Sequence, residues 1–180
     1  ILKCVPDIGQ IAYVHNVLGV IYYHRSLWQE SLEAYQRSLT LQRQIHDIWG
    51  QGNSLNNMGS VKLMTNHWSE AEGFFLESLH LREQLGDLTG IATSCNNLGH
   101  IYLQLKQYQP AISSLSRAHE IYRQLGNRLG EAIVLCNRGS AYMHDQNYSQ
   151  SEENLIIGIA LLKKLGAHSV LPEALNELTA

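Results

Sequence analysis

The stretch "NNLGHIYLQLKQYQPAISSLSRA", Asn96 to Ala118, has the pattern of two helices joined by a short polar turn. Asparagine and glycine are poor helix formers, yet "NNLG" stands inside the first of these two helical patterns. Forty residues earlier the chain has "NNMG", and forty residues later it has "CNRG". Because this unfavourable combination returns at a fixed interval, it indicates a repeated structural unit.

The forty-residue interval runs through most of the chain. The glycine after the asparagine position recurs at Gly19, Gly59, Gly99 and Gly139. An aromatic residue recurs in the same phase at Trp28, Trp68, Tyr108 and Tyr148. A second glycine recurs at Gly86, Gly126 and Gly166, and His46 takes its place in the first copy. Four copies in one phase predict four structural repeats.

Each repeat divides into two amphipathic helices. In the second copy, apolar residues three apart at Leu55, Met58 and Val61 predict a first helix from about 52 to 65. A polar turn follows, and a second helix is predicted from about 68 to 85. No strand pattern occurs, so the predicted fold class is all-α.

Local signals mark the ends of the second helix. In the first copy, Ser26 with Gln29 three residues later predicts a capping box at its start. In the third copy, Pro110 suits the first turn. The recurring glycine, Gly86 in the second copy, predicts a helix end in the left-handed conformation, where glycine has no steric penalty.

The register predicts one continuous array that fills the chain. Residues 1–9 match the end of a preceding second helix, the four repeats are 10–49, 50–89, 90–129 and 130–169, and residues 170–180 match the first helix of a following repeat. That last segment has an apolar stripe made of Leu171, Ala174, Leu175 and Leu178. An uncovered apolar stripe predicts self-association through this end of the chain.

Composition excludes several classes of partner. The formal charge of -3 provides no basic field for phosphates, which argues against nucleic acid and anionic membranes as partners. No apolar run approaches the roughly 20 residues that span a bilayer. The three cysteines have no CxxC spacing, which argues against a disulfide framework or a zinc knuckle and favours a cytoplasmic location.

Small residues at fixed places allow the two helices of a unit to approach closely. Besides the glycine of the first helix, they are Ser31, Ala71, Ala111 and Ser151. This arrangement resembles the tetratricopeptide repeat, and the copy from Asn96 to Ala118 is the most similar to the family pattern. The resemblance implies a solenoid of antiparallel helix pairs that winds into a right-handed superhelix and binds proteins.

The unit departs from the family pattern, and it lacks the family's usual proline at the end of the second helix. It has forty residues, where the family's usual unit has fewer, and this longer unit resembles kinesin light chains, Pins-type adaptors and bacterial signalling arrays. In addition, Lys62 stands where the other three copies have Tyr22, Tyr102 and Tyr142.

The resemblance also implies a binding surface, since the first helices of such arrays line the concave face. The predicted peptide-binding residues are Asn16, Asn53, Asn56, Asn57, Asn96, Asn97, His100, Gln104, Asn137, Ser140 and His144. None is charged apart from the titratable histidines, and carboxamides both donate to and accept from a peptide backbone. The alternative is that the asparagines bridge neighbouring helices or face water.

No catalytic, metal-binding or cofactor-binding residues are predicted. The nine histidines form no zinc motif, and Cys95 falls at a core-packing position. The leading functional prediction is a non-enzymatic scaffold or adaptor module that grips a peptide or protein segment. The alternative is a regulatory sensor array within a larger signalling protein such as an ATPase, a cyclase or a transcription regulator.

Overall fold

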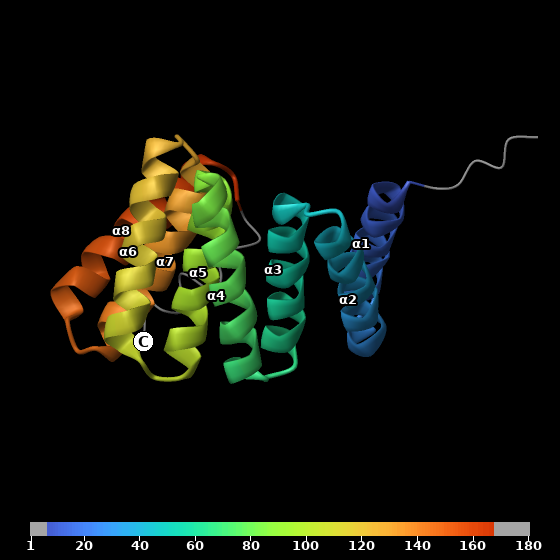
Figure 1. The fold of residues 1–180 in the computed structure, drawn as a ribbon. Coiled ribbons are helices and arrows are strands. Elements are labelled where there is room, and N and C mark those ends of the chain that lie inside the picture. The colour runs from blue at the N-terminus through green and yellow to red at the C-terminus, as the bar shows by residue number, and fades with distance from the viewer. Residues whose placement is uncertain (1–6, 168–180) are drawn as a thin grey trace, which may run out of the picture. The chain divides into compact units, whose positions relative to one another are not determined.

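The computed structural model describes residues 7–167, which form eight α-helices and no strand (Figure 1). The first helices of the four repeats are α1 (Ile8–His24), α3 (Ile48–Met64), α5 (Leu88–Gln104) and α7 (Arg128–His144). The second helices are α2 (Trp28–Gln44), α4 (Trp68–Leu85), α6 (Tyr108–Gln124) and α8 (Tyr148–Lys164). The predicted helix at 170–180, with Leu171, Ala174, Leu175 and Leu178, lies outside the described residues.

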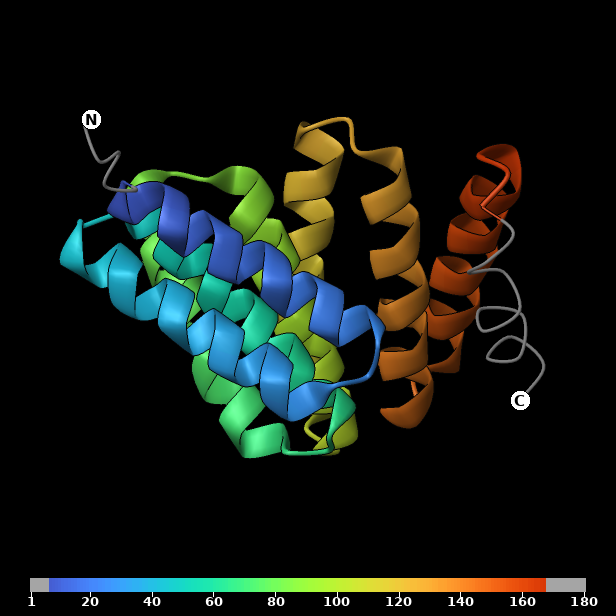
Figure 2. The ribbon, with the colours of Figure 1, turned by 90° about the vertical axis from the view of Figure 1, so that its right-hand side faces the viewer.

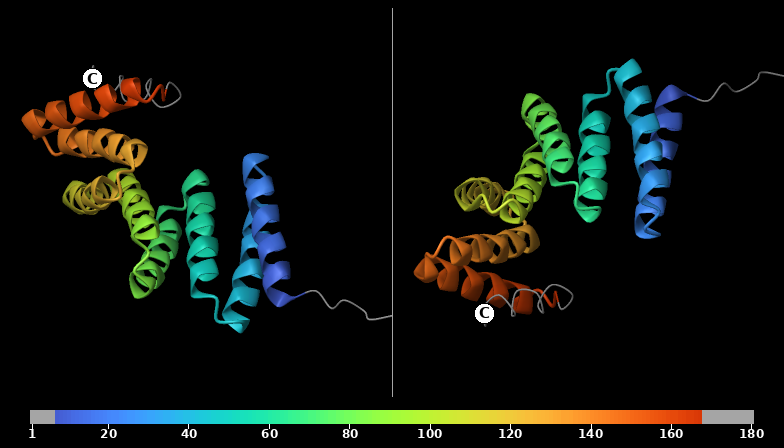
Figure 3. Two further views of the ribbon diagram at one scale, coloured as in Figure 1. Left: turned by 90° about the horizontal axis from the view of Figure 1, so that it is seen from above. Right: turned by 90° about the horizontal axis from the view of Figure 1, so that it is seen from below.

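The chain divides into two compact units, residues 1–87 and 88–180. In the first unit α1 packs against α2, α2 against α3 and α3 against α4. In the second unit α5, α6, α7 and α8 pack in the same successive order. Within each unit the paired helices lie side by side, as Figure 2 shows for α1 with α2 and Figure 3 for α7 with α8. This confirms the antiparallel helix pairs, and the right-handed winding of the whole array stays a prediction.

The first helices begin earlier than their apolar pattern predicts. The helix α3 starts at Ile48, and the side chain of Asp47 caps it by accepting the N–H of Gly50 at 2.9 Å. Asn127 caps α7 through Gly130 in the same way, again at 2.9 Å. The predicted start at Gly52 is therefore four residues late. Likewise, Ile8 and Gly9 belong to α1 and not to the end of a preceding helix.

The second helices begin and end where the register places them, although one predicted cap is wrong. Ser26 has a φ of 58° and lies in the turn, and Leu27 occupies the N-cap position of α2 without a side-chain hydrogen bond. The predicted capping box therefore does not form. The helix α4 ends at Gly86 with a φ of 65°, which confirms the left-handed helix end. His46 takes the equivalent position with a φ of 55°.

Close approach between the paired helices is confirmed by the contacts of the recurring glycine. A Cβ added at Gly59 would lie 2.7 Å from the ring of Phe75. Hydroxyl groups reinforce the approach, because Ser31 Oγ donates to the Gly19 carbonyl at 2.8 Å and Ser151 Oγ donates to the Gly139 carbonyl at 2.8 Å. The small residues thus serve both packing and hydrogen bonding.

Each unit has its own apolar core on the inner side of its helix pairs. In the first unit Phe75, Leu55 and Val61 are almost fully buried, and in the second unit Leu155 and Leu162 are. The opposite face of each first helix is left partly exposed, so it can contact a partner. No helix within residues 7–167 combines the length and the apolar character that crossing a bilayer requires.

Candidate peptide-binding surface

One face of α3 carries most of the predicted binding residues of the first unit. We define the α3 surface as the residues spaced three or four apart along this face: Trp49, Asn53, Asn56, Asn57, Ser60 and Met64. Trp49 is 60% exposed and Met64 is 53% exposed, and the polar residues between them are half-buried. The α3 surface therefore presents uncharged hydrogen-bonding groups between two apolar ends.

Trp49 belongs to this surface although no sequence argument selected it. Its ring lies under the guanidinium of Arg82 on α4, with the central carbon 5.7 Å from the ring centroid. This cation–π contact fixes one side of the indole, and the other parts remain exposed. Its spacing in the sequence could have identified it, because Trp49 precedes Asn53 by one helical turn and therefore shares its face of the helix.

Arg82 also fixes the orientation of Asn53. The Arg82 Nη2 group donates to Asn53 Oδ1, and the Nη1 group donates to Asp87 Oδ2 at 2.6 Å. The side chain passes directly over Gly52, where an added Cβ would lie 2.9 Å from Arg82 Nε. Because its oxygen is occupied, Asn53 has its Nδ2 group to offer as a donor to a ligand.

Asn16 makes a contact between helices. Its Nδ2 group donates to Ser54 Oγ on α3 at 3.2 Å, and that hydroxyl donates to Gln42 Oε1 on α2 at 2.8 Å. Ser54 is fully buried and Gln42 is 5% exposed. Asn16 therefore links α1 to buried side chains of α2 and α3. This matches the alternative prediction that the asparagines bridge neighbouring helices.

In the second unit, Asn137 on α7 makes a similar bridge. Its Nδ2 group donates to Asn96 Oδ1 on α5 at 3.1 Å, between two first helices. His144 is exposed and stacks on Tyr108, with the ring centroids 5.5 Å apart. Of the remaining predicted residues, Asn97 and Ser140 are half-buried, and His100 and Gln104 are exposed.

Cys136 is buried, although the forty-residue register alone would place it on the predicted binding surface. It occupies the same repeat position as Asn16, Asn56 and Asn96, which predicts exposure on the binding surface, but it is 7% exposed. Its sulfur lies against Gly158 on α8, where an added Cβ would be 2.7 Å away. Cys136 therefore packs in the core of the second unit, and Cys95, at 2% exposure, confirms the predicted packing role.

Burial shields the thiols of Cys95 and Cys136 from reagents in solution. Desolvation raises the pKa of the Cys136 thiol from 9.0 to about 11. In a Cys4→Ser variant, which leaves Cys95 and Cys136, we expect alkylation by iodoacetamide at pH 8 to be at least about tenfold slower in the folded protein than in urea. Because the folded state favours the neutral Cys136 thiol, the contribution of this group to the free energy of unfolding is complete below pH 9. It is lost as the pH rises toward 11. Alkylation at equal rates in both states would contradict this assignment.

Charged residues in the second unit are directed inward. Arg138 occupies the position that holds Leu18, Met58 and Leu98 in the other copies, and its Nε donates to Asn154 Oδ1 at 2.8 Å. Burial lowers the pKa of Arg138, and burial together with the charge of Arg138 lowers the pKa of His119.

No group of three or more His, Cys, Asp or Glu side chains in the described part of the chain could hold a metal ion.

The same fold occurs in several solved structures. A Rap protein complexed with competence and sporulation factor superposes with a TM-score of 0.85 at 18% identity, covering 99% of this chain and 53% of that one. A signal transduction ATPase with a tetratricopeptide repeat sensor from Pyrococcus horikoshii gives 0.86 at 15% identity, covering 98% and 28%. A putative kinesin light chain repeat structure from Podosopora anserina gives 0.77 at 14% identity, covering 97% and 86%.

This chain therefore spans about half of that Rap protein and about a quarter of that ATPase. A comparison with curated proteins finds no match. The family comparison is decisive, because the tetratricopeptide repeat model matches residues 10–84 and 88–170, which together form most of the chain. With its helix pairs and its forty-residue register, the chain belongs to the tetratricopeptide repeat family.

Proposed function

We propose that this chain is a protein-interaction module that binds an extended peptide, or an extended segment of a partner protein, along the first helices of its repeats. Tetratricopeptide repeats generally serve as non-catalytic interaction scaffolds, and the proposal concerns the residues that carry this role here. Within the first unit we propose the α3 surface as the contact. Within the second unit, taken by itself, we propose Asn97, His100, Gln104, Ser140 and His144.

The observation that carries the proposal is the Asn57 side chain. Its carboxamide is half-buried and has no hydrogen-bond partner among residues 7–167. Asparagine in mid-helix costs roughly half a kcal/mol relative to alanine, so a structural role would be expected to show a contact. An extended backbone has N–H and C=O groups that such a carboxamide can accept from and donate to at the same time.

The surrounding residues support an apolar anchor at each end. Trp49 and Met64 are the most exposed residues of the α3 surface, and they lie at its two ends. Aromatic side chains and methionine are enriched at protein interfaces relative to the rest of the protein surface, and they bury a large apolar area on binding. A peptide with apolar side chains near both ends of its bound segment would complement this arrangement.

A second candidate function is that of a sensor within a larger signalling protein. The similarity to an ATPase whose structure is described as containing a tetratricopeptide repeat sensor favours it, as does the similarity to a Rap protein complexed with a competence and sporulation factor. Ligand binding by the same α3 surface would serve both functions. A cytoplasmic location, which the cysteine usage favours, belongs to the same proposal.

Selection from a random peptide library tests the proposal directly. Peptides that bind the purified chain should lose about five- to thirtyfold in affinity when Asn57 is changed to alanine, because one or two hydrogen bonds of about 1 kcal/mol each are removed. Trp49→Ala should weaken binding further through the lost apolar area. Asn66→Gly, which removes an exposed amide from the α3–α4 turn, is the matched control and should bind normally.

Thermal melting separates binding asparagines from bridging ones. Asn57→Ala should melt at the same temperature as the unchanged chain or higher, because alanine is the better helix former. Asn137→Ala should melt lower, because it removes the hydrogen bond to Asn96 between α5 and α7, a contribution of about 1 kcal/mol. Lower melting of Asn57→Ala with unchanged peptide affinity would show that Asn57 is a structural residue.

A further inference from the structure

The helix α1 has an exposed apolar face on the side away from α2. We define the α1 stripe as Gln10, Tyr13, Val14, Val17, Val20, Ile21 and His24. Tyr13 is 70% exposed, and the other four apolar side chains are 37–53% exposed. Because successive helical residues differ by about 100° in direction, the stripe covers about 120° of the helix surface, centred on Val17. The opposite side carries Ala12 and Gly19, which contact α2.

Stacking of the kind seen between the repeats covers only one edge of such a face. In α3 the positions of Val14 and Ile21 are fully buried against α2. The positions of Tyr13, Val17 and Val20 stay half-buried in α3 and hold polar side chains there. The α3 residues are Ser54 and Val61 at the buried positions and Asn53, Asn57 and Ser60 at the half-buried ones. A preceding helix in the same place would therefore leave the centre of the α1 stripe exposed.

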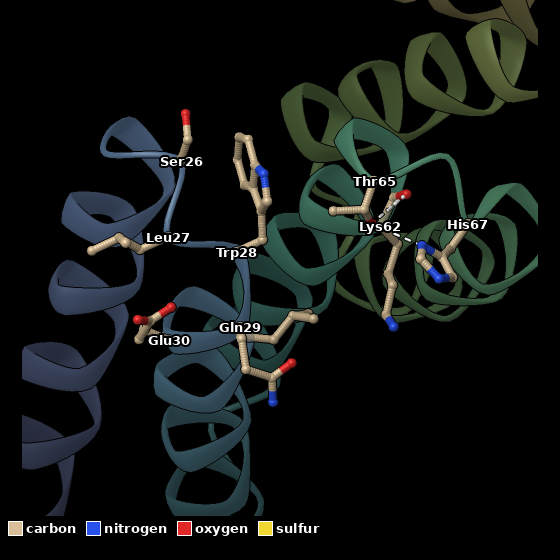
Figure 4. A pocket seen from close by; sticks show the side chains of 9 residues that line it. Ser26, Leu27, Trp28, Gln29, Glu30, Lys62, Thr65 and His67 are labelled. Atoms are coloured by element: carbon tan, nitrogen blue, oxygen red, sulfur yellow. Dashed lines mark hydrogen bonds between the residues drawn. The ribbon is translucent and has the colours of Figure 1, made fainter.

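The pocket at the α1–α2 turn is a separate feature of the first unit. It has a volume of about 450 Å³, and none of the residues that line it belongs to the α1 stripe (Figure 4). Its polar side chains do not converge, because Glu30 is directed away from Lys62 and His67. The members of the α1 stripe, in contrast, all lie on one side of a single helix.

The α1 stripe is uncharged at neutral pH and symmetric in its spacing. No Asp, Glu, Lys or Arg occurs in α1, so two copies of this face can meet without repulsion between like charges. The other members lie 3, 4 and 7 residues before and after Val17. A second α1 that is turned end for end about Val17 therefore presents the same spacing, as a two-fold symmetric contact requires.

We propose that the α1 stripe is a homodimer contact, in which α1 of one copy packs antiparallel against α1 of a second copy. The two-fold axis passes through Val17, which contacts Val17 of the partner subunit. Residues at equal distances from Val17 face each other, so Val14 faces Val20 of the partner subunit. Tyr13 faces Ile21 of the partner subunit in the same way. This contact is separate from the α3 surface and from the segment 170–180.

The polar ends of the stripe favour the antiparallel order over the parallel one. In the antiparallel pair Gln10 faces His24 of the partner subunit, and a carboxamide and an imidazole can each donate and accept a hydrogen bond. In a parallel pair His24 would face His24 of the partner subunit, and two imidazole rings repel each other when both are protonated. The antiparallel order also brings opposite ends of the two helix dipoles together.

The area of the stripe predicts a weak dimer. With these exposed fractions, the five apolar side chains present roughly 450 Å² per copy, which is within the range of functional apolar patches. Together with Gln10 and His24, two copies can bury up to about 1,200 Å², the lower end for a specific interface. We therefore expect a dissociation constant on the order of 100 μM.

Sedimentation equilibrium of the whole chain between about 10 μM and about 1 mM tests the contact. Val17→Asp should weaken self-association at least about tenfold, because two carboxylates then meet at the two-fold axis, and Val17→Lys should do the same. An equal mixture of these two variants should associate at least about tenfold more tightly than either variant alone. Leu76→Asp, at an exposed leucine of α4, is the matched control and should associate normally.

Disulfide formation tests the antiparallel order. The background is Cys4→Ser, in which the remaining cysteines, Cys95 and Cys136, are buried. Under air oxidation, a mixture of Gln10→Cys and His24→Cys chains should form a covalent dimer that contains one chain of each kind. Neither variant alone should form more covalent dimer than the background chain does. Linkage of each variant to itself would contradict the antiparallel contact.

Three results would overturn the proposal. One is a strict monomer at about 1 mM. Another is a mixture of Val17→Asp and Val17→Lys that associates no better than its components. The third is self-association that persists in Val17→Asp and is lost in Leu175→Asp, which would assign the contact to the segment 170–180. Because Asn57→Ala should leave the dimer unchanged, failure of this contact is distinguishable from failure of the α3 surface.

Discussion

Replacing Gly59 by alanine is expected to lower the free energy of unfolding by about 1–3 kcal/mol, although alanine is the better helix former. The added methyl group would lie 2.7 Å from the ring of Phe75, well inside contact distance. Phe75 is fully buried, so its ring cannot move aside without disturbing the core of the first unit. Urea unfolding followed by circular dichroism measures the effect.

The matched control is Gly73, a glycine within α4. An added Cβ at Gly73 meets nothing within 4 Å, so Gly73→Ala should raise the free energy of unfolding by about 0.5–1 kcal/mol. Opposite signs for the two glycine-to-alanine changes would attribute the loss at Gly59 to the neighbouring ring. If Gly59→Ala stabilises the chain as Gly73→Ala does, the close approach of α3 and α4 is wrong.

A double variant tests the same contact from the other side. Phe75→Ala should cost about 3–5 kcal/mol, because it leaves a cavity in the core. In this background Gly59→Ala should no longer destabilise, since the methyl group then enters empty space. A penalty for Gly59→Ala that is the same in both backgrounds would contradict a direct clash.

The forty-residue register predicted the helix pairs well, because each repeat must bury the same apolar stripe. The glycine and its bulky neighbour, such as Gly59 and Phe75, are linked by packing that recurs in every copy, so their spacing is visible in the sequence. Helix caps made by polar side chains are harder to predict from the sequence than this packing. Asp47 caps α3 from a position without apolar periodicity, so the predicted start of that helix was four residues late.

The candidate site was predictable only in part. The register places Asn16, Asn57 and Asn137 on first helices, but their hydrogen bonds depend on residues that vary between copies. Asn16 finds the hydroxyl of Ser54, whereas Asn137 finds the amide of Asn96. One sequence pattern therefore covers side chains that bridge helices and one, Asn57, that has no partner among residues 7–167.

The position of Arg82 illustrates why a single register position can hold different chemistry. The equivalent residues of the other copies are Gln42, Tyr122 and Leu162, and all four side chains are buried. A side chain at this position must fill the space between helices. The residues around it determine whether that side chain is polar or apolar. In the second repeat those partners are Asn53, Asp87 and the ring of Trp49.

Changing Asp87 to asparagine is accordingly expected to lower the free energy of unfolding by about 3 kcal/mol, near the lower end of the range for breaking a buried ion pair. The substitution keeps the size of the side chain but removes the charge that balances Arg82 at 2.6 Å. Asparagine also keeps the capacity to cap a helix, as Asn127 does at the same repeat position before α7. The loss would therefore reflect an uncompensated guanidinium, measured again by urea unfolding.

Arg82→Leu provides the decisive comparison, because leucine is the residue that the fourth repeat has at this position. Replacing a buried ion pair by a well-packed apolar side chain is often neutral or stabilising. The Nε of Arg82 is buried without a hydrogen-bond partner among the described residues, which favours this outcome. In the Arg82→Leu background, Asp87→Asn should then cost less than about 0.5 kcal/mol, because Asp87 has 22% side-chain exposure and can be hydrated. Equal costs of Asp87→Asn in both backgrounds would show that the contribution of Asp87 does not come from its ion pair with Arg82.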